Sequence, residues 1–492
     1  MGITDTAEAI MNWLGLELII ASEKSIVIND KKIKFIGVDE LIVKEEVNNH
    51  SNLNLSFRTA ESDIISVGQE ISIKAISNSN AIIFRNDLIF SGIIEKVEIR
   101  DNIVKLEAKS FSIELDIVKR KRTFQDKEKT YKDILDAVIK EGKYEKFKFL
   151  ISQNCNKPIE KLIIQYDETD WEFLKRIMSH LGESIIIENG ISYDKEIAEN
   201  NKDKKWTICL GLLADGKRDL HKPKYLVKGS VNLKEDYLLS SSSEKYEIGH
   251  YISHNEKLYI VTKSNIKNAG NVIIYEYTMV SKEKFISNRI KNQNIAGETI
   301  LAEVVEAGTG ENLTRVRVDF IFDKTPESKV PDNTRNAWNK YWFRLSTPYA
   351  GEGTGMYFMP EKGDKLLITF MNSEEENSFA GESIRDDNKF TDKNTELVHK
   401  RIKISTGQQV MLSKELEKVM LIGNDDRTVY EDVTKDHVRI VADESEGIFQ
   451  KDVISLQVGE SRIVLGADSI EIKCGSSHIK LDKSGKIEVK GS

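Results

Sequence analysis

The sequence is poor in cysteine and contains none of the common catalytic motifs. Its 492 residues include three cysteines, Cys155, Cys209 and Cys474, which lie far apart and form no CxxC pair. This pattern excludes a secreted disulfide framework and favours synthesis in a reducing cytoplasm, with each cysteine as a small packed side chain. No HExxH or G-x-S-x-G motif is present, and no Cys/His/Asp group surrounds a nucleophile. We therefore expect no catalytic residue, no metal and no cofactor.

Basic clusters and export signals are absent as well. The formal net charge is −8 and no Lys/Arg stripe stands out, which argues against a nucleic-acid partner. The apolar segment 7–21 has no basic start, carries Glu8 and Glu17, and is too short to span a membrane. We expect a protein made in the cytoplasm without a signal peptide, with residues 1–20 docking on a neighbour. If it leaves the cell, it does so inside an assembled particle.

Alternation of apolar and polar residues dominates the first part of the chain, whose length suggests roughly three to four units. Residues 25–116 follow a period of two, as in Ile26 and Ile28 or Ile71 and Ile73, and turn residues such as Gly68 separate the runs. This pattern predicts a small antiparallel barrel or sandwich. Strand character returns over residues 183–278.

Two short helices interrupt the β pattern. Each begins with a capping box, Thr130 with Asp133 and Thr169 with Glu172. Gly142 and Gly182 are expected to end them. The apolar stripes consist of Ile134, Leu135, Val138 and Ile139 in the first helix and Trp171, Leu174, Met178 and Leu181 in the second. Helices of about three turns are too short to stand alone, so both must pack on the strands.

Residues 299–385 form a compact β block. We predict strands over 300–306, 315–322, 341–346, 356–359 and 365–370, an arrangement typical of an OB-type barrel. The glycines of segment 351–355 favour a tight turn with positive φ over a phosphate cradle, because no helix follows them. The aromatic residues are interpreted as barrel core rather than as a sugar-binding platform; they are Trp338, Trp342, Tyr349, Tyr357 and Phe358.

Two further groups resemble metal sites only superficially. His250 and His254 lie in a strand-like segment, where a four-residue spacing places them about 13 Å apart, too far for one ion. The acidic run 374–376, together with Asp386 and Asp387, lacks the alternation and the glycine of a calcium loop. We interpret this run as a solvated hairpin tip. No pair of carboxylates stands out for glycoside cleavage.

Short apolar doublets recur near the C-terminus. Their first members are Ile454, Ile463, Ile470, Ile479 and Ile487, with steps of nine, seven, nine and eight residues. Each unit is one alternating strand with a turn and cannot bury its apolar face alone. About ten such strands at a spacing of about 4.7 Å make a rod on the order of 50 Å long, which three copies of the chain would close. His478 is read as a surface histidine rather than as part of a threefold metal cluster.

Several segments resemble VgrG-like and phage tail-spike hub proteins of contractile injection systems. Segment 121–126 (Lys-Arg-Thr-Phe-Gln-Asp) and segment 165–176 with Gly182 resemble the hub part of these proteins. Segment 342–364, running on to Phe370 and Gly381, closely resembles their OB-fold segment, and the repeats ending at 486–491 resemble their C-terminal prism. The parts occur in the family's order, so the resemblance covers nearly the whole chain.

The resemblance implies a mainly β fold with a defined order of parts. These are an N-terminal docking segment (1–20), a first hub barrel (21–125), a helical insert (126–190), a second hub barrel (191–295), an OB-fold neck (296–385), a linker (386–400) and a trimeric β-prism or β-helix spike (401–492). The implied protein is a homotrimer that adapts a sixfold tube to a threefold spike and pierces the target cell envelope on sheath contraction. Its implied partners are a tail-tube or tube-initiator protein, baseplate wedge proteins and a separate PAAR-like tip protein. The tip protein would dock at Lys486, Ile487, Glu488, Val489, Lys490, Gly491 and Ser492.

Two departures from some family members guide the functional expectation. The segment 386–400 is too short for an inserted lysozyme domain, and the sequence ends at Ser492 directly after the last predicted strand. We therefore expect a non-enzymatic component of a phage tail or of a phage-derived contractile bacteriocin, located in the assembled particle. The alternatives are a cell-wall-degrading baseplate enzyme, a type VI secretion spike that delivers effectors, and a surface-binding adhesin.

Overall fold

The computed structural model divides the chain into two compact units, Met1–Ile384 and Arg385–Ser492. It describes residues 21–77, 85–191, 206–211, 218–219, 225–231, 235–242, 245–270, 272–285, 287–322, 340–352, 354–384, 399–404, 406–413, 418–423, 428–432, 437–442 and 444–491. The N-terminal docking segment expected at residues 1–20 lies outside the described residues. No helix among the described residues is long and apolar enough to cross a membrane.

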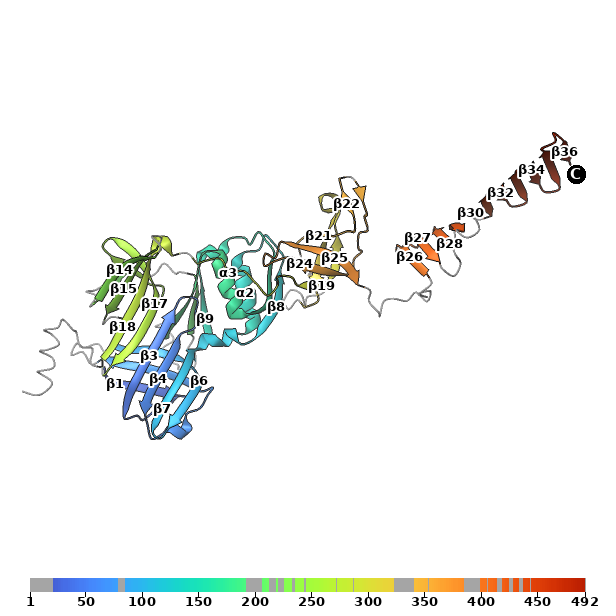
Figure 1. Cartoon of the computed structure of the whole chain (residues 1–492). Coiled ribbons are helices and arrows are strands. Elements are labelled where there is room, and N and C mark those ends of the chain that lie inside the picture. The colour runs from blue at the N-terminus through green and yellow to red at the C-terminus, as the bar shows by residue number, and fades with distance from the viewer. Residues whose placement is uncertain are drawn as a thin grey trace, which may run out of the picture. The chain divides into compact units, whose positions relative to one another are not determined.

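A thirteen-stranded sheet dominates the first unit (Figure 1). The main path of the sheet runs β14-β15-β18-β17-β3-β4-β7-β6-β5-β1-β2, while β16 pairs with β17 and β13 pairs with β16. The strands are β1 (Ala21–Ile28), β2 (Lys31–Ile33), β3 (Gly37–Glu46), β4 (Asn52–Arg58), β5 (Glu70–Ser77), β6 (Arg85–Arg100), β7 (Ile103–Ser110), β13 (Arg218–Asp219), β14 (Tyr225–Val231), β15 (Glu235–Ser242), β16 (Tyr251–His254), β17 (Lys257–Ala269) and β18 (Val272–Ser281).

The described strands of both expected hub barrels lie in this one sheet, and the division into two barrels stays a prediction. The early and late strands join where β17 pairs with β3, with Ile266 opposite Val43. Both side chains are fully buried and belong to one core that also contains Ile26 and Ile71, as the period-two pattern predicted. Among the described strands the two blocks therefore share one sheet and one core. The sequence concealed this because the pairing joins residues more than two hundred positions apart.

The helical region packs between this sheet and the barrel that follows, as Figure 1 shows. Both capping boxes are present, at Thr130 before α2 (Tyr131–Gly142) and at Thr169 before α3 (Asp170–His180). The predicted stop at Gly182 is confirmed, with a φ of 70°. The end of α2 differs, because Gly142 is its last helical residue and Lys143 adopts the left-handed conformation.

Short strands and 3-10 helices complete the helical region. Strand β8 (Lys119–Phe124) pairs with β10 (Ile163–Thr169), and β9 (Phe147–Ile151) joins β11 (Ile185–Ile191) through β12 (Trp206–Leu210). The 3-10 helices of the first unit are η1 (Ser62–Ile64), η2 (Phe111–Asp116), η3 (Gln153–Asn156), η4 (Lys282–Lys284) and η5 (Gly310–Asn312). The apolar faces of α2 and α3 pack together in one core around Trp171, Leu174 and Met178.

The first unit ends in a closed five-stranded barrel, which confirms the predicted OB-type block. Its strands are β19 (Thr299–Ala307), β20 (Arg315–Phe320), β21 (Phe343–Leu345), β24 (Lys365–Phe370) and β25 (Ser378–Ile384). The strand predicted over 356–359 is wrong: these residues are irregular and follow a small hairpin of β22 (Ala350–Gly351) and β23 (Thr354–Gly355). The barrel closes instead through β25, which was not predicted.

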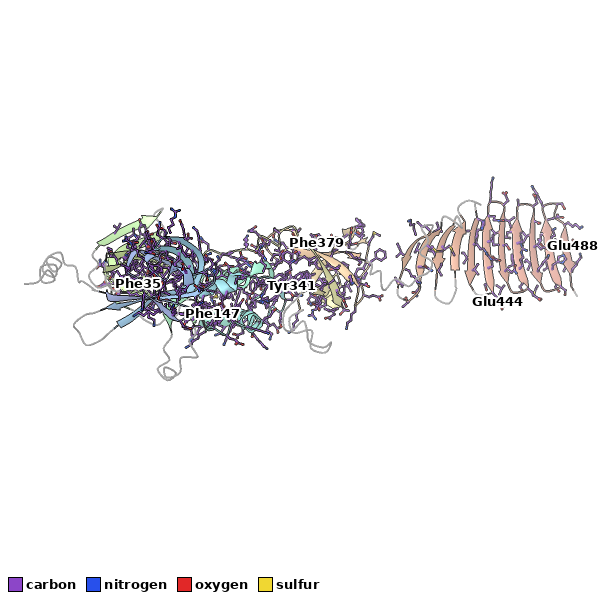
Figure 2. All side chains as sticks on the ribbon, turned by 90° about the horizontal axis from the view of Figure 1, so that it is seen from below. Phe35, Phe147, Tyr341, Phe379, Glu444 and Glu488 are labelled. Atoms are coloured by element: carbon purple, nitrogen blue, oxygen red, sulfur yellow. The ribbon has the colours of Figure 1, made fainter. Side chains whose placement is uncertain are left out.

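The second unit is an eleven-stranded antiparallel sheet in which each strand pairs with the next (Figure 2). Its strands are β26 (His399–Lys403), β27 (Gln409–Ser413), β28 (Lys418–Ile422), β29 (Thr428–Asp432), β30 (His437–Ala442), β31 (Ser445–Gln450), β32 (Val453–Val458), β33 (Ser461–Gly466), β34 (Ser469–Cys474), β35 (Ser477–Asp482) and β36 (Ile487–Lys490). From β30 to β35 successive strands begin eight residues apart, which is the regular period behind the uneven steps seen in the sequence.

Candidate functional site

Among the residues that the structure describes, those that resembled chemical sites in the sequence do not assemble into one. Gly355 has a φ of 139° beside the β22–β23 hairpin, which supports the turn interpretation. His250 precedes β16 and His254 ends it, and among the described residues no group of three or more His, Cys, Asp or Glu could hold a metal ion. Trp338, Asp386 and Asp387 lie outside the described residues.

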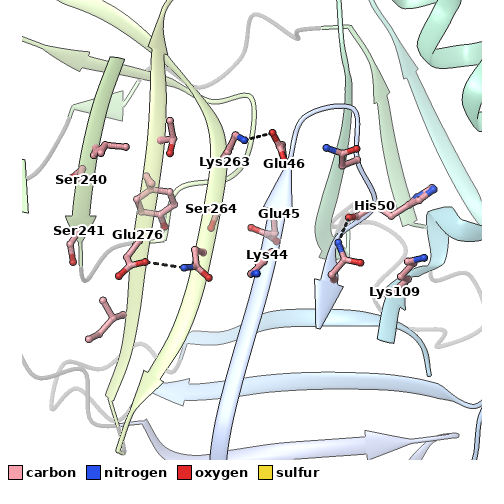
Figure 3. Close-up of a pocket in the computed structure, with 17 residues that line it drawn as sticks. Lys44, Glu45, Glu46, His50, Lys109, Ser240, Ser241, Lys263, Ser264 and Glu276 are labelled. Atoms are coloured by element: carbon pink, nitrogen blue, oxygen red, sulfur yellow. Dashed lines mark hydrogen bonds and ion pairs between the residues drawn. The ribbon is translucent and has the colours of Figure 1, made fainter. Parts of the chain in front are cut away.

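A polar groove crosses the large sheet where its early and late strands join (Figure 3). Its volume is about 980 Å³. One polar residue from each of six neighbouring strands lies in register across it: Ser241, Glu276, Asn265, Lys44, Asn52 and Lys109. The groove is also lined by the ion pair of Lys263 and Glu46, whose Nζ and Oε1 atoms lie 2.5 Å apart.

Several polar groups of this groove are held by ion pairs or hydrogen bonds. Glu276 accepts a hydrogen bond from Nδ2 of Asn265 at 2.9 Å and pairs with Lys267 at 2.8 Å. The ring of His50 contacts Ser112 at 2.7 Å and Asp116 at 3.2 Å, and burial lowers its pKa despite that carboxylate. Groups held in this way suit contact with water or a polar partner rather than proton transfer.

A buried ion cluster links helix α3 to the OB barrel. The side chain of Arg176 is fully buried, and its Nε and Nη2 atoms donate to the two carboxylate oxygens of Glu168, each at 2.7 Å. Nη2 also donates to the carbonyl of Ile164 at 2.7 Å, and Nη1 donates to Oε1 of Glu375 at 2.8 Å. Burial opposes the charge, but the two carboxylates outweigh it and raise the pKa of Arg176. We call Arg176, Glu168 and Glu375 the hub–neck cluster.

Polar neighbours complete the hub–neck cluster. Asn292 donates from Nδ2 to Oε2 of Glu168 at 3.1 Å and to the carbonyl of Tyr166 at 3.0 Å. Because Glu375 lies between β24 and β25, the cluster connects the helical region with the barrel through charge-assisted hydrogen bonds. Such an arrangement resists sliding of one part over the other, because any displacement leaves a buried charge without its partner.

A second buried arginine holds the helical region together. Nη1 of Arg122 donates to Gln165 and to Asp170, both at 2.5 Å, and its Nε donates to Glu141 at 2.6 Å. Tyr144 donates to the other oxygen of Asp170 at 2.5 Å. Segments 121–126 and 165–176, which carried the resemblance in the sequence, are thus brought together here by the β8–β10 pairing.

The structural role of Glu375 was not predicted from the sequence. It was predicted to belong to a solvated hairpin tip, but it is only 4% exposed, whereas Glu374 pairs at the surface with Arg289 and Lys291. The sequence offered one signal for such a role. Apolar residues flank the acidic run on both sides, at Phe370 and Ala380, as is expected of a loop between two barrel strands. Which of the three glutamates turns inward depends on the position of Arg176, and no local pattern reports that.

The aromatic residues of the OB block also differ from the prediction. Tyr349, Tyr357 and Phe358 are 59%, 55% and 53% exposed, so their interpretation as barrel core is wrong. Trp342 is half-buried under the guanidinium of Arg317, whose Cζ lies 4.2 Å from the ring centre. The barrel core is built instead from the alternating residues of its strands, with Phe320, Phe343 and Phe370 among them.

The C-terminal sheet carries an apolar row on one face, interrupted by a glycine at Gly447. Strand pairing places one residue from each of the eleven strands in register: Ile402, Val410, Leu421, Val429, Ile440, Gly447, Leu456, Ile463, Ile472, Ile479 and Val489. A parallel row on the same face runs through Ile454, Leu465, Ile470, Leu481 and Ile487. In the single chain most of the aliphatic side chains of these rows are partly exposed to solvent, from 37% at Leu481 to 68% at Val489, and Ile454 is half-buried.

Towards the C-terminus the opposite face of this sheet is polar, whereas in its earlier strands it also carries apolar positions such as Ile448 and Val464. It presents alternating charges such as Glu471, Lys473, Lys480 and Glu488, with Glu471 and Lys473 paired at 3.2 Å. His478 lies on this polar face, 4.0 Å from Glu488. A sheet with one charged and one solvent-exposed apolar face is incomplete as a single layer, because the apolar face requires a partner surface.

The residues predicted for tip docking lie at the last strand of this sheet. Ile487 and Val489 belong to the apolar face, Glu488 and Lys490 to the polar face, and the backbone N–H of Lys486 donates to Asp482 at 3.0 Å. Gly491 is exposed, and Ser492 lies outside the described residues. Among the described strands β36 pairs only with β35, so its other edge offers backbone groups to a partner strand.

Comparisons with known proteins match separate parts of the chain. Residues 44–192 match the phage tail baseplate hub family (GPD), and residues 300–380 match the type VI secretion system/phage-baseplate injector OB domain. Both families are structural, and neither match is to a catalytic domain. No curated protein sequence matches the chain.

Two solved structures share the fold at low sequence identity. The E. coli c3393 protein, a type VI secretion component with structural similarity to the bacteriophage T4 tail proteins gp27 and gp5, is 14% identical with a TM-score of 0.50, over 73% of this chain and 99% of that one. The Francisella PdpA–VgrG complex contains a chain that is 10% identical with a TM-score of 0.51, over 99% of this chain and 91% of that one.

Proposed function

The chain carries a phage tail baseplate hub region and an injector OB domain, and on this premise we propose that three copies form the hub and central spike of a contractile injection apparatus. The hub would adapt the sixfold tube to the threefold spike, and the C-terminal rod would pierce the target cell envelope on sheath contraction. The protein acts through shape and stiffness in this proposal and carries out no catalysis. Its place is the baseplate of a virion or of a phage-tail-like particle.

The observation that carries the proposal is the exposed apolar row of the C-terminal sheet. Its eleven positions run through all eleven strands, and a lone chain leaves it in water. Burial of apolar surface contributes about 25 cal/mol per Å², so covering the aliphatic side chains of these rows stabilises an assembly strongly. Three identical sheets that turn their apolar faces inward and their charged faces outward satisfy this requirement by threefold symmetry.

Stiffness follows from the same arrangement. Neighbouring turns of the rod are linked by backbone hydrogen bonds, as between Lys483 N–H and the carbonyl of Asp468 at 2.9 Å and between Ala467 N–H and the carbonyl of Asp452 at 3.2 Å. Eleven strands at about 4.7 Å each give a length of roughly 50 Å. In the first unit, the buried ion pairs of the hub–neck cluster hold the OB barrel against the helical region.

The partners follow from the surfaces that remain open in such a trimer. The edge of β36 with Lys486, Ile487, Glu488, Val489, Lys490, Gly491 and Ser492 is the proposed dock for a separate PAAR-like tip protein. The hub would contact the tail-tube or tube-initiator protein and the baseplate wedges. We favour a phage tail or a phage-derived contractile bacteriocin over a type VI spike, because the hub region matches a phage tail family. Neighbouring capsid genes would indicate a phage, and sheath and tube genes without them a bacteriocin or secretion system.

The piercing role is tested by removing part of the rod. Deletion of residues 455–492 should leave a folded hub and particles that still assemble their sheath, but it should abolish killing or secretion. Full activity of particles with the truncated chain would overturn the role. A zymogram with cell-wall substrate separates this function from the alternative of a cell-wall-degrading enzyme, for which we expect no cleared band.

A further inference from the structure

The OB barrel presents an exposed apolar patch that the rod interface leaves unused. Leu313, Tyr349, Met356, Tyr357 and Phe358 are 52%, 59%, 43%, 55% and 53% exposed, and we call them the neck patch. They come from the turn after η5 and from the segments on either side of the β22–β23 hairpin. Aromatic residues and methionine are enriched in the centres of protein interfaces, whereas a soluble surface rarely gathers five such side chains.

Hydrogen bonds hold the neck patch in one arrangement. The hydroxyl of Tyr357 donates to the carbonyl of Leu313 at 2.9 Å, which joins the two segments. The N–H of Met356 donates to the carbonyl of Tyr349 at 2.9 Å, and its own carbonyl accepts from Oγ1 of Thr347 at 2.8 Å. A surface whose backbone is fixed in advance loses little conformational freedom on binding.

The polar atoms of the neck patch are occupied, which bears on the kind of partner. The Tyr357 hydroxyl is bound to the Leu313 carbonyl, and the Tyr349 hydroxyl lies 3.3 Å from Oγ1 of Thr354. A sugar would need free hydrogen-bonding groups beside the rings to fix its orientation. The atoms left for a partner are apolar, so the neck patch suits an apolar protein surface better than it suits a glycan.

We propose that the neck patch is a second interface between copies of this chain, a proposal that rests on the trimer proposed above. Only fourteen residues separate Ile384 at the end of the barrel from His399 at the start of the rod strands. Copies joined through their rods thus keep their OB barrels tethered together, and a short tether corresponds to a local concentration on the order of millimolar. At that concentration a modest apolar contact becomes occupied.

The exposed area of the neck patch is sufficient for such a contact. An aromatic side chain buries about 150–250 Å² in full, so five large side chains that are about half-exposed offer roughly 500 Å² per copy. Three patches that converge on a threefold axis then bury about 1,500 Å² in total, or about 500 Å² for each pair of copies, which is a weak contact that the tether keeps occupied. The contact would hold the three OB barrels of the assembly together.

Site-specific photo-crosslinking in the full-length protein tests this interface. We replace Phe358, Ile472 or Lys480, one at a time, by p-benzoylphenylalanine and irradiate the purified protein. Ile472 lies in the apolar row and reports the rod interface, whereas Lys480 lies on the charged face and serves as the outward control. We expect intermolecular products from Phe358 and Ile472, with the Phe358 adduct mapping to residues 299–384 of another copy.

Each outcome of this experiment decides between the two proposals. Products from Ile472 with none from Phe358 would overturn the neck interface and leave the trimer standing. No products from either position would overturn both. Equal yields from Lys480 and Phe358 would show random collision and also contradict the interface.

A double variant, Tyr357→Ser with Phe358→Ser, supplies a second readout. Both residues are exposed, so their replacement spares the barrel core. We expect a trimer that dissociates at a protein concentration about tenfold or more above that of the wild type, which for a monomer–trimer equilibrium is about a hundredfold in the dissociation constant, or about 2.7 kcal/mol per trimer. An unchanged dissociation concentration would contradict the proposal.

Discussion

The Nη1 atom of Arg176 lies 2.8 Å from Oε1 of Glu375, and this ion pair joins helix α3 to the OB barrel across 199 residues of sequence. Both side chains are buried, and Glu168 neutralises the second half of the guanidinium. Because these ion pairs are buried, we expect the helical region and the barrel to move together as one rigid unit. In a protein proposed to work by transmitting thrust, this is the joint where a single substitution should have the greatest effect.

Replacing Arg176 by methionine should destabilise the first unit by about 3–5 kcal/mol, because Glu168 and Glu375 would remain buried without their cation. Denaturant unfolding measures the loss, and hydrogen exchange should accelerate in α3, β24 and β25. Arg289→Met is the matched control: its partner Glu374 is at the surface, so it should cost about 0–1 kcal/mol. Equal effects of the two substitutions would contradict the role of the cluster.

Removal of the whole ion cluster should be milder than removal of its cation. In the triple variant R176M/E168Q/E375Q no buried charge remains, so part of the lost free energy of unfolding should return. Unfolding curves of the single and triple variants, measured side by side, give the comparison. A triple variant less stable than Arg176→Met would show that the stability of this contact depends on side-chain packing rather than on charge balance.

Acid should weaken the first unit through His180. Burial, reinforced by Lys161, Arg176 and Arg289, lowers the pKa of His180 to about 2. Below about pH 6.5 the unfolded chain takes up a proton that the folded chain refuses, so the free energy of unfolding falls by up to about 1.4 kcal/mol per pH unit. Between pH 6.5 and 5 this amounts to about 2 kcal/mol.

The substitution His180→Gln checks this pH dependence. Glutamine does not titrate, so the variant should lose about 2 kcal/mol less than the wild type when unfolding curves at pH 6.5 and pH 5 are compared. An identical pH slope for both proteins would assign the acid sensitivity to other groups.

The three cysteines should differ sharply in reactivity. Cys155 and Cys209 are buried, and burial raises the pKa of Cys155 to about 11 and that of Cys209 further still, so both thiols stay protonated at pH 8. Cys474 is exposed in the single chain but lies on the apolar face, in register with Ser461. Maleimide labelling followed by mass spectrometry should therefore find Cys474 protected in the native assembly and reactive once the rods separate. Rapid labelling of Cys474 in the intact trimer would contradict the inward direction of this face.

Local features of the structure were readable from the sequence, and non-local ones were not. The structure confirms the capping boxes at Thr130 and Thr169, and it confirms that Ile26 and Ile28 lie on the same buried face. These features depend only on residues within one helical turn or one strand. The pairing of Val43 with Ile266 and the inward turn of Glu375 depend on partners far along the chain. The exposure of Tyr357 and Phe358 was mispredicted because aromatic composition does not say which side of a loop meets solvent.

The C-terminal rod shows the same division. The apolar doublets correctly indicated short strands with turns, but counting their first members concealed the eight-residue step between strands. Only the register shows that Ile463, Ile472 and Ile479 form one continuous row rather than independent pairs. The partner that covers this row cannot be inferred from the pattern of one chain, and it is therefore the central claim to be tested.

That claim is tested most directly by the native mass of the full-length protein and of two rod variants, measured by multi-angle light scattering. We predict three times the chain mass of 56.0 kDa for the wild type and for Lys473→Asp on the charged face. Ile472→Asp places three carboxylates in an apolar interior, which costs several kcal/mol and should shift the protein towards single chains. A wild-type protein that stays at the mass of one chain, or an Ile472→Asp variant as trimeric as Lys473→Asp, would contradict the account.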